Sequence, residues 1–175
     1  GRTKGDTEGF LPGTEGDWQD VFAVFIKNPA NFAASTSPSH NGSAQFNTMM
    51  WLFSPHGTAL LGNDNTDNGV PGSTLLASST DGIINLAQAP PGVYYLAVSG
   101  FNSMPQTVNG DPMFPFPGPD GVIVSPTPQG FLDEVGSWNP DQTPGTHGDY
   151  VISLPPDTIF TIPLPCGEVE SGSCF

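Results

Sequence analysis

Hydrophobic residues along this chain fall into short runs that are bounded by turn-forming residues. The runs DVFAVFIK (20–27) and GVYYLAVSG (92–100) alternate with a period of two or are continuously apolar, and Gly, Pro, Asn and Asp flank them. This pattern predicts β-strands, and no segment shows the period of an amphipathic helix. The predicted strands are residues 20–27, 31–36, 48–54, 58–62, 73–78, 82–87, 92–100, 121–125, 148–154 and 157–164.

Many short strands separated by turn signals predict an all-β fold, an antiparallel β-sandwich or jelly roll. The length of 175 residues suits one domain. We expect an extended N-terminal arm at 1–15, the sandwich at 16–154, and a C-terminal strand with a cysteine loop at 155–175. Residues 101–147 are rich in Pro and Gly and contain one predicted strand, which indicates a long loop insertion over one end of the sandwich.

The charge balance restricts what the domain can bind. The chain has 17 acidic and three basic residues, a formal net charge of -14, and beyond Arg2 and Lys4 its only basic residue is Lys27. Internal salt bridges therefore cannot neutralise the carboxylates, whereas bound divalent cations can. Nucleic acid and anionic membrane surfaces are unlikely partners because both require basic patches. No apolar run is long enough to predict membrane insertion.

Two acidic clusters are candidates for calcium ligands, because calcium prefers six to eight oxygen ligands. Asp17 and Asp20 stand three residues apart in front of the first apolar strand, where their carboxylates can converge. The alternative is a solvated turn with local hydrogen bonds. Acidic residues also lie upstream of this pair, at Asp6, Glu8 and Glu15.

The second cluster is the loop NDNTDNG (63–69). Its residues Asn63, Asp64, Asn65 and Asp67 alternate as in oxygen-rich metal loops. An EF-hand is excluded, since the flanking helices and the later glutamate are missing. An ordinary hairpin loop remains an equal alternative, because Asn and Asp favour tight turns.

The two cysteines, Cys166 and Cys174, are close enough in sequence to form a small disulfide loop. Free thiols and bridges to a neighbouring chain are the alternatives. The small number of lysines and the excess of carboxylates favour an oxidising, extracellular setting.

Catalytic motifs are missing from the sequence. It contains neither G-x-S-x-G nor H-E-x-x-H, and His40, His56 and His147 all fall in turn sequences. We therefore predict that the protein is not an enzyme.

Several aromatic residues sit in or beside loops, where they could stack on sugars or pin the long insertion to the sandwich; we favour pinning. They are Trp18, Phe101, Phe114, Phe116, Phe131 and Trp138.

Five segments occur in an order that resembles a known family: GDWQDVFAVFI, FAASTS, MMWLFSPHGTALLGNDN, PPGVYYLAVSG and HGDYVISL, within residues 16–154. The order resembles that of the bacterial pre-peptidase C-terminal domain family, which includes the collagen-binding domains of secreted clostridial collagenases. The resemblance implies a secreted, non-catalytic jelly roll whose calcium ligands come from an acidic linker and from an aspartate pair, here Asp17 and Asp20. The alternating glutamates of that linker are missing here.

Together these features predict a secreted, calcium-binding, non-enzymatic β-sandwich with a structural role that assembles with copies of itself. The alternative is an adhesion module that binds an extracellular polysaccharide or a matrix protein such as collagen. The predicted strand 157–164 could complete the chain's own sheet or add to the sheet of a neighbouring copy.

Overall fold

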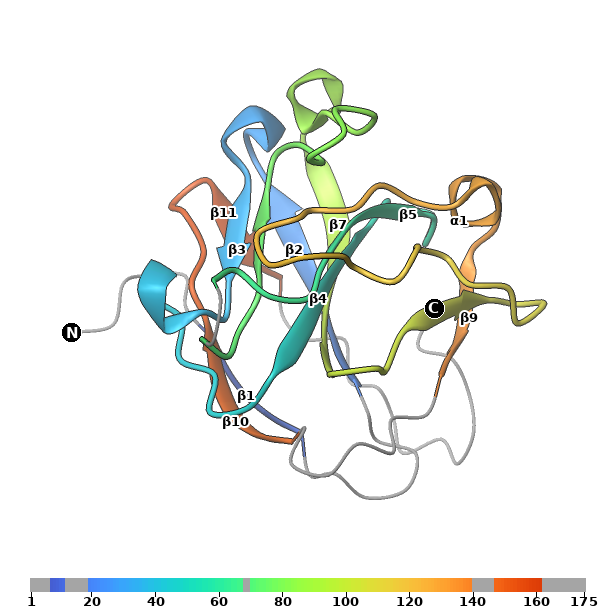
Figure 1. The fold of residues 1–175 in the computed structure, drawn as a ribbon. Coiled ribbons are helices and arrows are strands. Elements are labelled where there is room, and N and C mark those ends of the chain that lie inside the picture. The colour runs from blue at the N-terminus through green and yellow to red at the C-terminus, as the bar shows by residue number, and fades with distance from the viewer. Residues whose placement is uncertain (1–6, 12–18, 68–69, 140–146, 162–175) are drawn as a thin grey trace.

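The computed structural model of the chain describes residues 7–11, 19–67, 70–139 and 147–161, and residues 7–11 by their backbone alone (Figure 1). The described residues form eleven strands, one α-helix and three 3-10 helices. The strands are β1 (Thr7–Leu11), β2 (Gln19–Ile26), β3 (Ala33–Ser35), β4 (Thr48–Phe53), β5 (Ala59–Asn63), β6 (Thr74–Leu76), β7 (Gly92–Gly100), β8 (Pro105–Thr107), β9 (Val135–Trp138), β10 (Gly148–Ile152) and β11 (Thr158–Phe160). The helices are η1 (Pro29–Asn31), η2 (Pro38–His40), η3 (Leu86–Gln88) and α1 (Pro128–Leu132).

The main sheet has five antiparallel strands in the order β11-β2-β7-β4-β5. Strand β7 lies at its centre and pairs with β2 along eight positions, from Gln19 opposite Ser99 to Ile26 opposite Gly92. All six residues of β4 are buried, which explains why its sequence is continuously apolar instead of alternating. The prediction of an all-β, antiparallel fold is confirmed.

A second layer packs on one face of the main sheet. It contains the antiparallel pairs β1-β10 and β3-β6. Ser35 of β3 and Ser153, which follows β10, join the two pairs through reciprocal backbone hydrogen bonds of 3.0 and 2.8 Å. Leu96 from the main sheet and Ile152 from the second layer belong to one hydrophobic cluster, so the packing is sandwich-like.

The other face of the main sheet is covered by the long insertion, which lies in front of β4 and β5 in Figure 1. The ring of Phe114, 1% exposed, packs 5.0 Å from the ring of Trp51 and 6.2 Å from that of Phe53. Trp138 meets Phe53 edge-on at 6.3 Å. Phe114 and Trp138 therefore pin the insertion, and it covers a face of the sheet instead of one end.

Three predicted details were wrong for local reasons. Residues 82–87 do not form a strand, because the Asn85 side chain accepts a hydrogen bond from the backbone of Ala87 and starts η3. Residues 121–125 form only a single bridge, between Val124 and Gly62. The insertion also contains the helix α1, which has only five residues and is too short to show a helical period.

The segments predicted to flank the sandwich both supply strands to it. The N-terminal strand β1 pairs with β10, with Thr7 opposite Ile152. The C-terminal strand β11 pairs with β2, with Ile159 opposite Phe25. Of the two possibilities for the last strand, completion of the chain's own sheet is the one observed.

Candidate functional site

Five of the predicted site residues lie outside the described residues: Asp6, Glu15, Asp17, Cys166 and Cys174. Calcium binding by Asp6, Glu15 and Asp17 and pairing of the two cysteines therefore remain predictions. Glu8 lies in β1 opposite Val151, and only its backbone is described.

Asp20 has a structural contact within the domain. The hydroxyl of Tyr150 donates a hydrogen bond to its carboxylate. Tyr150 is 1% exposed, and its ring packs edge-on against Phe46 at 6.4 Å. Asp20 thus connects β2 of the main sheet to β10 of the second layer.

Asn63 organises the loop that follows β5. Its amide nitrogen donates to the carbonyl oxygens of Asn65 at 3.2 Å and Val122 at 2.9 Å, and its amide oxygen accepts from the backbone N–H of Thr74 at 2.9 Å. The side chain is 1% exposed. Both ends of the amide are engaged within the protein, so we assign Asn63 to holding the loop.

Asp64 is the predicted ligand that the structure leaves without an internal partner. Its side chain is 5% exposed, and its Oδ1 atom is buried without a hydrogen-bond partner among the described residues. Burial, followed by the negative charge of Asp120, raises the pKa of Asp64 from 3.8 to about 6. At neutral pH a buried carboxylate is therefore mostly ionised here, and no cation of the described residues pairs with it.

Asp120 is the residue that the sequence did not reveal as part of this site. It lies in the insertion, and backbone hydrogen bonds fasten the residues after it to the β5 end of the main sheet. Gly121 N–H donates to the Asn65 carbonyl at 2.7 Å, and Gly62 and Val124 exchange hydrogen bonds of 3.1 and 2.8 Å. Only this long-range pairing brings the charge of Asp120 close to Asp64.

Asp67 has a different partner, although it belongs to the same loop. Its Oδ2 atom accepts a hydrogen bond of 2.7 Å from the hydroxyl of Ser39. That bond uses the single hydroxyl proton of Ser39, so the contact of 2.9 Å between Ser39 Oγ and His40 Nδ1 requires the proton to be on His40. The arrangement therefore lacks the serine-to-histidine proton path of a nucleophilic triad.

The Asp64 site has few charged side chains that could bind a metal. Within the described residues, no group of three or more His, Cys, Asp or Glu side chains is gathered as a metal centre would require. A cation at Asp64 would take its carboxylates from Asp64 and Asp120 and its remaining ligands from carbonyl oxygens and water, which is ordinary chemistry for calcium.

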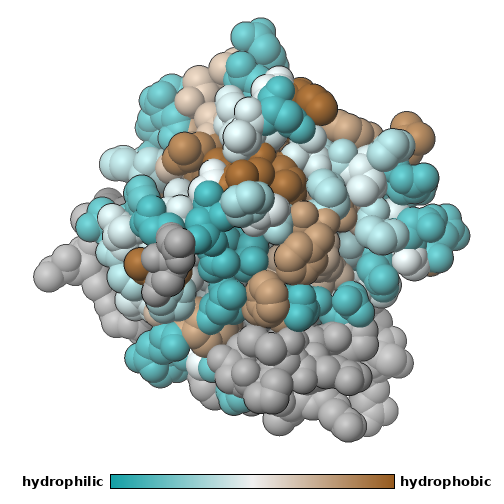
Figure 2. Space-filling view, in the orientation of Figure 1, coloured by the Kyte–Doolittle hydropathy of each residue, from teal (hydrophilic) through white to brown (hydrophobic). Residues whose placement is uncertain are grey.

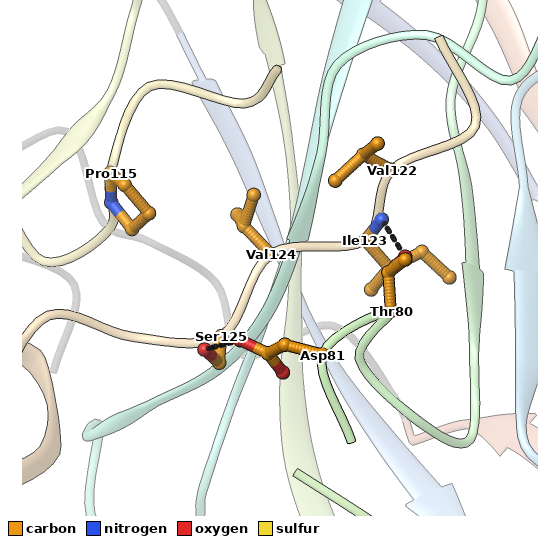
Figure 3. A pocket seen from close by; sticks show the side chains of 7 residues that line it. All are labelled: Thr80, Asp81, Pro115, Val122, Ile123, Val124 and Ser125. Atoms are coloured by element: carbon orange, nitrogen blue, oxygen red, sulfur yellow. Dashed lines mark hydrogen bonds between the residues drawn. The ribbon is translucent and has the colours of Figure 1, made fainter. Parts of the chain in front are cut away.

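A nearby pocket of about 230 Å³ contains another aspartate, Asp81, beside the apolar side chains Val122 and Val124 (Figure 3). The hydroxyls of Ser125 and Ser79 donate to Asp81 at 2.5 and 2.6 Å. Together with the backbone N–H of Ile83, these donors lower the pKa of Asp81. Asp81 is therefore satisfied by the protein and holds a turn, in contrast to Asp64.

Among the residues that the structure describes, no helix is long and apolar enough to cross a membrane. Comparisons with protein-family models, with curated proteins and with solved structures found no match. The resemblance to pre-peptidase C-terminal domains therefore remains a prediction.

Proposed function

We propose that this chain is a non-catalytic, calcium-binding domain with a structural role, and that one calcium site lies where Asp64 meets Asp120. The observation that carries the proposal is the buried, unpartnered Oδ1 atom of Asp64. A second site at Asp17 and Asp20, as the family resemblance implies, belongs to the same proposal, as does the jelly-roll topology.

The argument for a metal follows from the cost of an unpaired buried charge. An ionised carboxylate that is removed from water must be hydrogen-bonded, paired or metal-bound, or it becomes neutral. The pKa of about 6 means that Asp64 is mostly ionised at pH 7. A protein cation is scarce, because Lys27 is the only basic residue after position 4. A dissolved divalent ion can supply the missing charge for both aspartates.

The site fits calcium better than the transition metals. Zinc sites use Cys and His ligands in tetrahedral geometry, whereas the groups available around Asp64 are carboxylate and carbonyl oxygens. A site with two carboxylates has weak affinity, in the range of about 10⁻⁴ to 10⁻³ M that is typical of extracellular modules. Such an affinity would suit a protein that works outside the cell, which is part of the same proposal.

The structural role follows from the two elements that the aspartates belong to. Asp64 follows β5 of the main sheet, and Asp120 belongs to the insertion that covers its outer face. A shared calcium ion would cross-link the sheet to its cover. Bound calcium would also reduce the net charge of -14 that keeps copies of the chain apart, which supports the proposal of self-assembly.

Calcium titration by isothermal calorimetry tests this function, with Asp64→Asn as the variant and Asp111→Asn as the matched control. Asp111 is an exposed aspartate in the turn after β8, where its carbonyl oxygen accepts from the Thr107 N–H, and its side chain has no hydrogen-bond partner among the described residues. We expect Asp64→Asn to lose one calcium ion per chain and Asp111→Asn to lose none. Equal calcium stoichiometry in all three proteins would refute the site at Asp64.

Self-assembly is tested separately by analytical ultracentrifugation in calcium and in EDTA. We expect a larger particle in calcium and a monomer in EDTA. A monomer in both buffers, measured at a calcium concentration that saturates the calorimetric site, would remove self-assembly and leave the calcium proposal in place.

A further inference from the structure

A groove of about 880 Å³ lies on the second layer. It borders the 63–67 loop through Ser39, which donates to Asp67, and Thr74, whose N–H donates to Asn63, but neither Asp64 nor Asp120 lines it. Its floor is formed by β3, by β6 and by Ser153. Residues of η2 border the groove, and so does the segment of Pro155 and Pro156 that leads into β11. The volume is within the range of sites that bind small molecules or short peptide segments.

Part of the groove lining is aliphatic. Leu76 and Ile159 line it and are 51% and 42% exposed, and Pro155 and Pro156 add further apolar surface. The floor hydroxyls of Ser35 and Thr74 hydrogen-bond to each other at 2.7 Å, which reduces their demand for water. An aliphatic ligand placed here would bury apolar area without leaving these hydroxyls unpaired.

Polar side chains also line the groove. Lys27 lines the groove and makes no ion pair with a described residue, although the chain has 17 acidic side chains. His40 and Asn41 also line it, and the His40 Nε2 atom and the Asn41 amide can hydrogen-bond to a peptide, whereas the Ser39 hydroxyl is engaged with Asp67 and His40. The groove therefore offers one site for an anion and several for the donors and acceptors of a peptide backbone.

The charge of the chain decides how acidic the occupant can be. With a net charge of -14, the domain repels polyanions, so an acidic polysaccharide is disfavoured. A single carboxylate placed on Lys27 meets attraction from that residue with less long-range repulsion. The lining residues also include no Phe, Tyr or Trp side chain on which a sugar ring could stack.

We propose that this groove binds an extended, aliphatic peptide segment that carries one carboxylate, with the carboxylate on Lys27 and the aliphatic side chains against Leu76 and Ile159. Neither Asp64 nor Asp120 lines the groove, so peptide binding should be unchanged in Asp64→Asn. The two proposals can therefore fail independently.

The test is an NMR titration of the full ¹⁵N-labelled chain with two synthetic peptides. The first is an acetyl-capped pentapeptide of Val, Leu and Ala with a free C-terminal carboxylate, and the second is the same peptide with a carboxamide. We expect amide shifts at the groove residues and an affinity for the acid that is about threefold to fivefold higher, which is the scale of one exposed ion pair. In Lys27→Met the two peptides should bind equally.

A matched pair of leucine variants tests the aliphatic part. Leu76→Ser should weaken both peptides severalfold, whereas Leu132→Ser should weaken neither, because Leu132 is 81% exposed on α1 and does not line the groove. Three results would overturn the proposal. These are the absence of shifts at groove residues at millimolar peptide, equal affinity of wild type for acid and amide, and stronger shifts with decanoate or trigalacturonate than with the acid peptide.

Discussion

Replacing Asp64 with Asn should make the metal-free protein more stable at neutral pH, which is the reverse of what most core substitutions do. The variant keeps the shape of the side chain and removes its charge. In wild type the folded state raises the pKa of this carboxyl from 3.8 to about 6. The folded protein therefore binds the proton more tightly than the unfolded chain does, and ionisation of Asp64 opposes folding.

The size of the effect follows from the two pKa values. Their difference, about 2.2, corresponds to about 3 kcal/mol at 1.36 kcal/mol for each pKa unit. Asp120 is exposed and water at the loop surface screens part of the charge, so we expect about 1–3 kcal/mol. The penalty is complete above pH 6, decreases as the pH falls, and vanishes below pH 3.8.

Urea denaturation in EDTA between pH 4 and pH 8 measures this difference. The free energy of unfolding of Asp64→Asn minus that of wild type should be about 1–3 kcal/mol at pH 7.5 and near zero at pH 4. Subtracting the two proteins removes the contributions of the other carboxylates. In calcium at about 100 times the Kd of the site, the free energy of unfolding of wild type should rise by about 2.7 kcal/mol. The rise should be smaller in Asp64→Asn, because this variant lacks the site at Asp64.

The reasoning is refuted if Asp64→Asn is less stable than wild type in EDTA at every pH. That result would mean that the carboxylate already has a favourable partner inside the protein. The Asp111→Asn variant, measured in parallel, should have the same free energy of unfolding as wild type at every pH, because the carboxylate that it removes is exposed.

Three further substitutions test the packing and the hydrogen bonds. Phe114→Ala should lower the free energy of unfolding by about 3–5 kcal/mol in urea denaturation, because it leaves a cavity against Trp51; a loss below about 1 kcal/mol would contradict the pinning of the insertion. Tyr150→Phe should cost about 1–3 kcal/mol at pH 7 in the same assay, because the Asp20 carboxylate loses a donor; an unchanged midpoint would argue against this contact. Asp81→Asn should lower the melting temperature at pH 7 and have little effect well below pH 3.8, since a lowered pKa stabilises the fold above the unfolded value and the gain is lost on acidification; a pH-independent difference would contradict this.

Much of the main sheet could be predicted from the sequence, because its strands are buried and their apolar runs are long. The predicted strand 92–100 coincides with β7, and the predicted strand 48–54 differs from β4 by one residue. The errors occur where local side chains decide the backbone. The apolar run 82–87 became a turn and a 3-10 helix, with Ile83 63% exposed, because Asn85 caps the helix.

The candidate site could be predicted only in part. The loop 63–67 is rich in oxygen ligands and contains Asp64, whose pKa the fold raises, while metal binding by this loop stays a prediction. The sequence could not show that Asp64, and not Asn63, has an unpartnered side-chain oxygen. Both ends of the Asn63 amide are hydrogen-bonded within the protein. Nor could the sequence reveal Asp120, because the pairing of Val124 with Gly62 is a single long-range bridge without a strand-like pattern around it.

A crystal structure of the protein grown in calcium and recorded near the calcium absorption edge tests the proposed site most directly. We expect an anomalous peak about 2.3–2.6 Å from Oδ1 of Asp64, with Asp120 or a carbonyl oxygen among the other ligands. Asp64 hydrogen-bonded only to water or to a protein donor, with the calcium elsewhere or absent, would contradict the proposal.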